Sequence, residues 1–475
     1  MHHRIDRDKC ISCWGCLQTC PVGAIFQNSD SAIINPAFCT DCGFCAKVCP
    51  VDAVCKTDTQ FSEDFADTKS PSKHHTGFES TLECDVVVIG GGPAGLTAAY
   101  FIAKKGGSVT VIERRKELGV PVACAEGISV TGLKKAFEPH KRWISSTIEG
   151  VRLYTPTGRM IFIDHPSAGF VLDRPIFEND IAQMALDVGA EIFTETSVIE
   201  ISGYKTIDYI VIEQNEQLRK IIAKHYIDAS GIAGIAAMWA FPQTKLSEEG
   251  FHTCAQVLLE SDDFNHEPVA EFWWGSEIAP GGYVWVFPKG GKRANVGLGI
   301  IPKLAGQKRP ADFLQTFLQK RFSDYTIIEH RDGVVPATKR LSPMGRGNLL
   351  LAGDAARLTN AISGGGLDSA LASGKLAAET ISNLWNSPHE KILAEYEKQW
   401  KSSAGKLLDL YAKLRMGIVQ LSDNELEIIA DVIERNLAGK TWYALDIPAI
   451  VWDIAKTSPK LLKIAGKFFI NYFKG

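Results

Sequence analysis

Two cysteine runs near the start of the chain have the spacing needed to hold iron–sulfur clusters. They read "CISCWGCLQTCPV" from Cys10 and "CTDCGFCAKVCPV" from Cys39, so the pattern C-x2-C-x2-C-x3-C-P-V occurs twice. Iron in sulfide clusters takes soft thiolate ligands, four for each cubane. A C-x2-C-x2-C loop supplies three of these ligands, and the fourth must come from elsewhere in the chain.

In a two-cluster arrangement, the cysteine that precedes proline completes the other cluster. We therefore expect two [4Fe–4S] clusters with crossed ligands. The ligands of the first are Cys10, Cys13, Cys16 and Cys49, and those of the second are Cys39, Cys42, Cys45 and Cys20. Zinc is the alternative, but zinc sites use pairs of C-x2-C knuckles without a third cysteine at this spacing. Residues 1–56 resemble a bacterial-type two-[4Fe–4S] ferredoxin.

A glycine-rich turn follows further along the chain, in "DVVVIGGGPAG". Gly90, Gly92 and Gly95 fit G-x-G-x-x-G between a predicted strand and a predicted helix. Such glycines let backbone N–H groups approach a pyrophosphate at the helix N-terminus. Glu113 ends the next predicted strand, where an acid would accept hydrogen bonds from the adenosine ribose hydroxyls. The pattern predicts a dinucleotide site and leaves the choice between NAD and FAD open.

A second glycine–aspartate element favours FAD. In "LLLAGDAARLTNAISGGGLDSALASG", Asp354 ends a predicted strand and the glycines 364–366 open a helix. An acid at a strand end can bind ribityl or pyrophosphate-linked hydroxyls, and a second helix N-terminus can lie near a flavin edge. The alternative is an ordinary strand–turn–helix with a capping aspartate.

The order and spacing of several stretches carry a wider resemblance. They are "DVVVIGGGPAG", "VIERRKELGVPVACAEGIS", "LDRPIFENDIAQMALDVGAEI", "GGYVWVFPKGGKRANVGLGI" and "LLLAGDAARLTNAISGGGLDSALASGKLAAE". From Asp85 to about Trp400 the chain resembles the geranylgeranyl reductase family of flavoproteins, which has the para-hydroxybenzoate-hydroxylase-like FAD fold. The resemblance implies FAD contacts at Gly95, Glu113, Cys124, Ala125, Gly127, Arg174, Val198, Asp354, Gly366 and Leu367.

Two of these residues have alternative roles. The guanidinium of Arg174 can bind flavin or phosphate oxygens, or it can form a salt bridge with Asp173 or Glu178. Cys124 is expected beside the isoalloxazine by the resemblance. There it either supports proton delivery to the reduced double bond or shapes the pocket as a small apolar residue.

Tyr283, Trp285 and Phe287 alternate along the chain, as residues on one face of a strand do. The resemblance implies that this face lines a cavity for an isoprenoid chain. An aromatic wall suits a long polyunsaturated hydrocarbon, although a plain sheet core is the alternative. Cys124, Tyr283 and Trp285 are the candidate catalytic residues.

Length and composition set the frame for these sites. The 475 residues are 45% apolar and 22% charged, which indicates a globular chain, and length suggests roughly two to four domains. A net charge of −4 gives no sign of nucleic-acid binding. The polar first residues contain no secretory signal, no apolar run predicts a transmembrane helix, and the clustered cysteines favour a reducing cytosol.

We expect a mixed α/β (α+β) chain. A ferredoxin-like 2×[4Fe–4S] module is predicted over 1–56, followed by a polar linker over 57–81 that could let the module swing. A Rossmann-like FAD domain is predicted within 82–390, formed by residues 82–175, 190–240 and 330–390. An antiparallel-sheet substrate domain (about 145–190 and 245–330) is inserted into it, and a helical region follows over 391–475.

The tail "PKLLKIAGKFFINYFKG" predicts an amphipathic basic helix, which fits an anionic membrane surface or packs on its own domain. The expected location is cytoplasmic, peripheral at the membrane inner face.

The resemblance implies an FAD-dependent reductase that saturates isoprenoid C=C bonds, here the geranylgeranyl groups of archaeal-type ether lipids. Electrons would come from an external low-potential donor, such as a ferredoxin, through the two clusters to FAD. The alternatives are a reductase of another prenyl lipid (a menaquinone side chain or a chlorophyll prenyl tail), a flavin monooxygenase, and an electron-transfer flavoprotein:quinone-type oxidoreductase.

Overall fold

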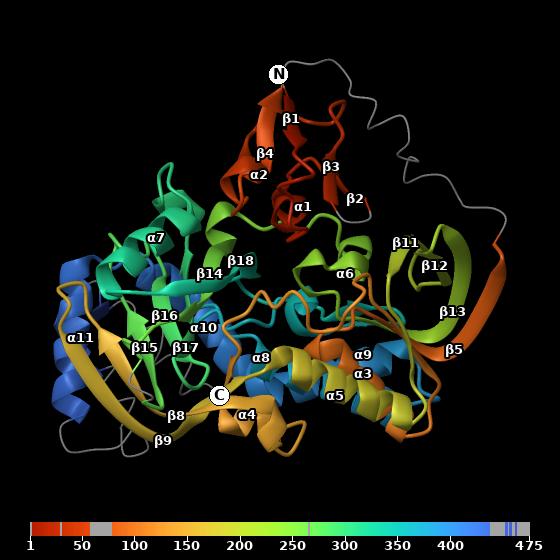
Figure 1. Cartoon of the computed structure of the whole chain (residues 1–475). Coiled ribbons are helices and arrows are strands. Elements are labelled where there is room, and N and C mark those ends of the chain that lie inside the picture. Colours follow the sequence, from red (N-terminus) through yellow and green to blue (C-terminus); the bar gives the residue numbers. More distant parts are fainter. Residues whose placement is uncertain are drawn as a thin grey trace.

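The computed structural model describes residues 2–28, 31–57, 78–264, 267–437, 452–454, 456–457 and 461–462. In Figure 1 the N-terminal module lies at the top of the molecule, above two large sheets and the helices that cover them. The predicted mixed α/β fold, with a ferredoxin module first and a helical region last, is confirmed.

The N-terminal module is built from two similar halves. Its elements are β1 (His2–Ile5), α1 (Gly15–Thr19), β2 (Ile25–Asn28), β3 (Ser31–Ile34), α2 (Phe44–Lys47) and β4 (Val54–Thr57). β1 pairs with β4 and β2 pairs with β3, both antiparallel. The sequence repeat is also a backbone repeat, since positive φ angles at Ser12, Trp14 and Gly23 recur at Asp41, Gly43 and Asp52.

The first large sheet has a parallel centre. The strands are β5 (Ser80–Ile89), β6 (Val109–Ile112), β10 (Glu191–Phe193), β11 (Thr196–Ser202), β12 (Tyr209–Gln214), β13 (Gln217–Asp228), β19 (Gly345–Arg346) and β20 (Leu349–Leu351). β10, β6, β5, β13 and β20 run parallel in that order, and β13, β12 and β11 continue as an antiparallel meander. Residues 86–89 are almost fully buried, as strands covered on both faces must be.

Strand β5 begins inside the predicted linker. Ser80 and Thr81 pair with Arg219 and Lys220 of β13, whereas the sequence placed both residues in the linker 57–81. These two residues are polar and exposed, so no apolar pattern marks them as strand. Residues 58–77 of the linker lie outside the described residues.

Three helices pack beside the first sheet: α3 (Pro93–Lys104), α5 (Arg174–Asp187) and α8 (Leu367–Asn383). α3 contacts both α5 and α8, so α5 accompanies the FAD-type layer. The sequence had grouped residues up to about 190 with the inserted sheet. α5 differs from the strands before it because Asp173 caps a new helix, its Oδ1 accepting the N–H of Ile176 at 3.2 Å.

The second sheet contains the strands β18-β14-β17-β16-β15-β8-β9-β7 in that order. Their bounds are β7 (Gly127–Ile128), β8 (Ile144–Tyr154), β9 (Met160–Leu172), β14 (Phe251–Glu260), β15 (Val269–Trp273), β16 (Tyr283–Pro288), β17 (Arg293–Ile300) and β18 (Thr326–Pro336). Helix α7 (Pro310–Arg321) covers one face, where Val284 and Val286 pack with Leu314 and Phe317. Two further helices are short: α4 (Val130–Lys134) contacts α8 and β9, and α6 (Ile235–Ala240) contacts β11, β13 and β19 of the first sheet.

The C-terminal region is helical, as expected. It comprises α9 (His389–Trp400), a π-helix (Lys401–Gly405), α10 (Lys406–Ile418) and α11 (Asp423–Leu437). Of the predicted amphipathic tail, only Leu461 and Leu462 are among the described residues. Within the part of the chain that the structure describes, no helix is both long enough and apolar enough to span a bilayer.

Candidate active site

The glycine turn leaves open space at the start of α3. A Cβ at Gly95 would lie 1.9 Å from the Gly90 carbonyl oxygen, and Gly90 itself has a φ of +105°. A Cβ at Gly92 would meet no atom within 4 Å. The turn therefore needs two of its glycines for its own shape, and the space beside the third is free for a pyrophosphate at the helix N-terminus.

Glu113 closes this turn from the neighbouring strand. Its Oε2 accepts the N–H of Gly91 at 2.7 Å, and its Oε1 accepts the N–H of Arg115 at 2.9 Å. Its carbonyl oxygen accepts the N–H of Thr196, so β11 begins beside it, and Val198 lies buried two residues further along. The structure thus gathers Glu113 at the turn and places Val198 in the sheet behind it.

Asp354 lies at the N-terminal end of α8, directly after β20. Its Oδ1 accepts the hydroxyl of Thr359 at 2.7 Å, and a Cβ at Gly366 would lie 3.3 Å from the same oxygen. Burial raises the pKa of Asp354, while the charge of Arg174 lowers it in part. Gly366 caps α8 and Leu367 is its first residue. A buried acid beside a helix N-terminus is compatible with the ribityl part of FAD, and this contact stays a prediction.

Arg174 forms the salt bridge with Glu178 that the sequence left open, and its contact with flavin stays a prediction. Its Nε donates to Glu178 Oε1 at 2.6 Å, and its guanidinium also contacts Cys124 and faces Asp354. Burial alone would lower the pKa of Arg174, but Glu178 and Cys124 outweigh it and raise the pKa. Because its charge is already paired, Arg174 can hold a polar edge of a flavin without remaining an isolated buried cation.

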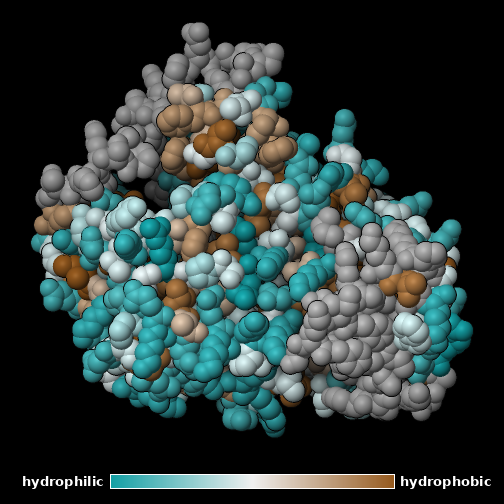
Figure 2. All heavy atoms as spheres, turned by 180° about the vertical axis from the view of Figure 1, so that it is seen from behind, coloured by the Kyte–Doolittle hydropathy of each residue, from teal (hydrophilic) through white to brown (hydrophobic). Residues whose placement is uncertain are grey.

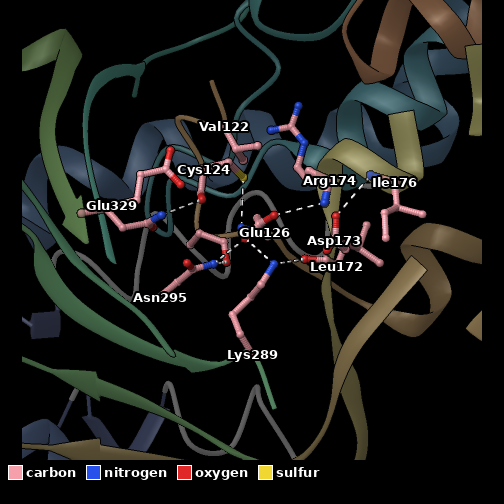
Figure 3. A network of polar contacts seen from close by, with 12 residues as sticks. Val122, Cys124, Glu126, Leu172, Asp173, Arg174, Ile176, Lys289, Asn295 and Glu329 are labelled. Carbon is pink, nitrogen blue, oxygen red and sulfur yellow. Dashed lines mark hydrogen bonds and ion pairs between the residues drawn. The ribbon is translucent and has the colours of Figure 1, made fainter. Parts of the chain in front are cut away.

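Cys124 lies in a turn that three distant segments hold in place (Figure 3). Its Sγ accepts the N–H of Glu126 at 3.2 Å, and its carbonyl oxygen accepts Nε2 of Gln256 at 3.0 Å. The same glutamine accepts the indole N–H of Trp285 at 3.0 Å through Oε1. Two of the candidate catalytic residues, Cys124 and Trp285, therefore both hydrogen-bond to the side-chain amide of Gln256.

Glu126 is the centre of this network, and no sequence pattern assigned it a role. It is 2% exposed, with a φ of +68°. Its Oε2 accepts Lys289 Nζ at 2.8 Å and Asn295 Nδ2 at 2.6 Å, and its Oε1 accepts the N–H of Arg174 at 3.1 Å. Asn295 also donates to the carbonyl of Ala125 at 3.2 Å. The stretches "CAEGIS" and "YVWVFPK" contained Glu126 and Lys289, but only the sheet brings them together.

The aromatic face of β16 points at this turn and at the glycines before α8. The Tyr283 hydroxyl donates to the carbonyl of Ser363, and a Cβ at Gly127 would lie 2.6 Å from the Phe287 ring. Phe272 adds to this face, with its ring centre 5.5 Å from those of Tyr283 and Phe287. The predicted strand with alternating faces is confirmed. An apolar wall borders the segments expected to hold the flavin.

The eight cysteines of the module form two groups. Cys10, Cys13, Cys16 and Cys49 line one small pocket. Burial, together with the charges of Cys49 and Cys10, raises the pKa of Cys13 to about 12. A group of buried and half-buried thiols that repel one another as thiolates fits a bound cluster, whose iron stabilises the thiolate form.

The second group consists of Cys39, Cys42, Cys45 and Cys20. Burial, followed by the charges of the other three cysteines, raises the pKa of Cys45 to about 12. Among the described residues, no three His, Cys, Asp or Glu side chains converge closely enough to hold a single metal ion. A cubane spreads its four thiolates over four iron atoms, so each group fits such a cluster. The crossed pairing is a prediction that this grouping supports.

The module is docked on the rest of the molecule through α1. Gln18 Nε2 donates to the carbonyl of Ala233 at 2.9 Å, and its own carbonyl accepts the N–H of Leu246 at 2.9 Å. The Thr19 hydroxyl donates to the carbonyl of Leu246 at 3.1 Å. A small pocket beside this contact is lined by Gln18 at one end and Asp354 at the other. The module therefore lies directly against the predicted FAD site.

Comparisons with known proteins agree with this geometry. Three families match: "Geranylgeranyl reductase catalytic domain" over residues 250–335, "FAD dependent oxidoreductase" over 85–281 and "4Fe-4S dicluster domain" over 9–53. The open choice between NAD and FAD is thereby decided for FAD, and iron–sulfur clusters are the cofactors of the module.

Similar whole proteins are also known. A digeranylgeranylglycerophospholipid reductase from Methanocella arvoryzae is 35% identical over 399 residues, covering 80% of this chain and 98% of that protein. One from Methanosarcina mazei is 38% identical over 391 residues, covering 80% and 94%.

Solved structures give the same result. A geranylgeranyl bacteriochlorophyll reductase-like protein from Thermoplasma acidophilum has a TM-score of 0.75 and 28% identity, covering 81% of this chain and 98% of that one. A flavin-dependent brominase, at 18% identity and a TM-score of 0.57, shares the fold. The chain therefore belongs to the geranylgeranyl reductase family of FAD-dependent oxidoreductases and carries a two-cluster [4Fe–4S] domain ahead of its FAD-binding domain.

Proposed function

We propose that this protein saturates isoprenoid C=C bonds, specifically the geranylgeranyl groups of archaeal-type ether lipids, with electrons that enter through its own iron–sulfur clusters. The observation that carries this proposal is the aromatic face of β16. It is directed at both segments expected to surround the flavin, the Cys124 turn and the Ser363 loop. The relatives at 35% and 38% identity bear the name of a reductase of such lipids.

Reduced FAD supplies the hydride for one alkene carbon, and a proton must reach the other. The chain's own contribution begins with binding. Tyr283, Trp285, Phe272 and Phe287 offer rings without charges, and such a surface holds a hydrocarbon and excludes water. The hydroxyl of Tyr283 and the indole N–H of Trp285 are both used in hydrogen bonds to protein, so the rings are fixed in orientation.

The proton side of the reaction points to Cys124. Its Sγ lies in the turn that Glu126, Lys289 and Asn295 hold, and Arg174 contacts it. We propose that Cys124 borders the isoalloxazine and holds a proton at Sγ for the second alkene carbon. Arg174 and Asp354 would hold the cofactor, with Gly92 and Glu113 at its pyrophosphate and ribose.

The direct test is an anaerobic lipid assay. The purified protein, with FAD and both clusters in place, is reduced with dithionite and incubated with a geranylgeranyl ether lipid. We expect the lipid to gain about two mass units for each double bond reduced. The proposal would be overturned if the flavin is reduced but no lipid of this class reoxidises it and none gains mass.

A second prenyl substrate has one observation in its favour. The similar Thermoplasma structure is described as geranylgeranyl bacteriochlorophyll reductase-like. The same assay with a menaquinone or a chlorophyll carrying an unsaturated prenyl tail separates these substrates by product mass. Reduction of a quinone head group without any saturated lipid would instead indicate an electron carrier.

We also propose a membrane contact and a protein donor. The tail sequence places Lys460, Lys463, Lys467 and Lys474 on one helical face, with aromatic residues on the other, as in helices that lie on anionic membranes. Co-sedimentation with anionic and with neutral vesicles tests the contact. Equal binding to both, or binding that survives replacement of these lysines by glutamate, would contradict it. The donor would be a low-potential iron–sulfur protein.

A further inference from the structure

The two cysteine loops of the module repeat in sequence and backbone but have different surroundings. The first loop, residues 10–16, is packed on the FAD-binding part. Arg114 Nη2 donates to the carbonyl of Ser12 at 3.3 Å, and the Arg114 guanidinium lies 5.2 Å from the centre of the Trp14 ring. Arg114 directly follows Glu113, the acid that closes the glycine turn. The first loop therefore touches a residue beside the predicted FAD site.

Trp14 marks the difference between the repeats. It has a φ of +61° and is 4% exposed, whereas Gly43 takes the equivalent place in the second repeat with a φ of +74°. A left-handed backbone strains any residue other than glycine, so the bulky indole is kept at a position where glycine would fit more easily. The indole supplies the contact with Arg114 that glycine cannot make.

A second contact leads from the first loop toward Cys124. A Cβ at Gly15 would lie 3.2 Å from Val334 Cγ1 on β18. A Cβ at the preceding residue of that strand, Gly333, would lie 3.5 Å from the Cβ of Ala123. Ala123 precedes Cys124 in the turn expected beside the flavin. The first loop thus packs on a strand that touches the flavin-side turn.

The second loop, residues 39–45, faces outward. Asp41, the counterpart of Ser12, pairs with His3 at 2.9 Å and Lys56 at 3.3 Å, both within the module. Phe44, the counterpart of Gly15, is 37% exposed, and the ligand Cys42 is exposed. Figure 2 shows apolar side chains gathered on the module at the top of the molecule. An exposed ligand is where an outside carrier can come close to a cluster.

Helix α1 is common to both groups. Cys16 and Cys20 lie at its two ends and are both buried, and Cys20 interacts electrostatically with Lys245 of the FAD-binding part. Both clusters therefore have one ligand on the inner side of the module. The two clusters differ in the loop that carries most of their ligands. The loop of residues 10–16 packs on the FAD-binding part, and the loop of residues 39–45 faces outward.

We propose that the cluster of Cys39, Cys42, Cys45 and Cys20 receives electrons from outside, and that the cluster of Cys10, Cys13, Cys16 and Cys49 passes them to FAD. This order rests on the proposed function. A low-potential iron–sulfur carrier is oxidised by one electron at each encounter. Two such electrons, with two protons from solvent, reduce one FAD, and both clusters return to their oxidised state.

The outer half of the order is tested with a matched pair of variants. Phe44 lies between Cys42 and Cys45, and Ile11, 41% exposed, lies between Cys10 and Cys13. Each is replaced by glutamate, and the protein is mixed with a photoreduced bacterial-type ferredoxin in a stopped-flow instrument. We expect the second-order rate of cluster reduction to fall about tenfold for Phe44→Glu and less than about twofold for Ile11→Glu. The reverse result, or equal effects, would overturn the order.

The inner half is tested with Arg114→Ala, using Arg114→Lys as the conservative variant. We expect clusters to be reduced at the normal rate while flavin reduction, followed by its own absorbance, slows about tenfold and recovers in part with lysine. FAD and iron contents are measured first, so that lost cofactor is not mistaken for slow transfer. Unchanged flavin reduction would overturn the proposal. These measurements need no lipid. If electrons move in the expected order but no lipid is saturated, only the proposed function is overturned.

Discussion

At the scale of single residues, the most consequential group is the buried carboxylate of Glu126. It neutralises Lys289, whose side chain is 13% exposed. We predict that Glu126→Ala lowers the free energy of unfolding by about 3–5 kcal/mol, because it leaves a buried cation without its partner. FAD affinity should fall as well, since the Cys124 turn loses its anchor. Urea unfolding and a flavin fluorescence titration measure the two effects.

Glu267→Ala is the matched control for this variant. Glu267 pairs with Arg152, but its side chain is 47% exposed. Solvent screens such a pair, so the cost should stay below about 1 kcal/mol, with FAD binding unaffected. If the two substitutions lower the free energy of unfolding equally, the Glu126 network stabilises the fold no more than an exposed ion pair does.

Cys124 gives the second prediction at this scale. If its Sγ delivers the proton, Cys124→Ala should slow lipid saturation by about a hundredfold while leaving flavin reduction unchanged. Cys124→Ser should recover part of the rate, because a hydroxyl can still transfer a proton. The solvent deuterium isotope effect on saturation should change in both variants. If the alanine variant saturates the lipid at the wild-type rate, Cys124 has only a structural role.

The residues found from sequence and those missed differ in one physical respect. Asp354 stands in a local strand–turn–helix pattern, and Cys124 and Arg174 stand in short stretches whose resemblance to the family implies their roles. Gln256 binds the carbonyl of Cys124 across 132 residues of sequence, and Lys289 reaches Glu126 across 163. Such pairs depend on the register of the second sheet, which periodicity does not reveal.

At the scale of elements, β16 separates stability from function by its two faces. Val284 and Val286 pack under α7, while Tyr283 holds the Ser363 carbonyl on the other side. We predict that Val286→Ala lowers the free energy of unfolding by about 1.5–3 kcal/mol and leaves FAD affinity unchanged. Tyr283→Phe should do the opposite. It should weaken FAD binding by about 1 kcal/mol through the loosened glycine loop, with little effect on unfolding.

Unfolding and FAD titration of both variants give the check. Loss of FAD affinity in Val286→Ala equal to that in Tyr283→Phe would mean that the strand responds as a whole. The alternation of this strand was visible in the sequence because aromatic and aliphatic residues alternate strictly. The start of β5 was not visible, because Ser80 and Thr81 pair at an exposed strand end without any apolar signal.

At the scale of the whole molecule, a buried histidine joins the C-terminal helices to the second sheet. Arg415 of α10 lies 3.3 Å from His252 Nε2 on β14 and donates to the carbonyl of Phe251. Burial, and then the charge of Arg415, lower the pKa of His252 to about 3 from 6.5. Between these two values, His252 is therefore neutral in the folded state and protonated in the unfolded chain.

This difference fixes the sign of the pH dependence. The contribution of His252 is constant above about pH 6.5 and is lost as the pH falls toward about 3, by up to about 1.4 kcal/mol per pH unit. We predict that His252→Gln removes about 1.6 kcal/mol of the loss between about pH 6.5 and pH 5. His225, with a pKa lowered to about 4, accounts for a remaining slope. Urea unfolding followed by tryptophan fluorescence tests this, and an unaltered slope would contradict it.

The position of the ferredoxin module is the main feature that sequence could not supply. A long polar linker is compatible with a module that swings, whereas the structure holds α1 on the FAD-binding part through Gln18, Thr19 and Leu246. An ion pair of Lys47 with Glu248, at 3.1 Å, adds to the same contact. Contacts of this kind depend on two folded surfaces meeting, and neither surface has a pattern of its own in the sequence.

The docked arrangement predicts that the length of the linker does not matter. Inserting about ten glycine and serine residues into the 58–77 segment should leave the rate of cluster-to-flavin transfer within about twofold of wild type, because surface contacts set the distance. Leu246→Asp should weaken the docking at α1 and make the rate depend on linker length, since the module then spends more time held only by its tether. Flavin reduction after rapid mixing with dithionite measures both. A rate that falls with linker length in the otherwise unaltered protein would mean that the module transfers electrons from a mobile state.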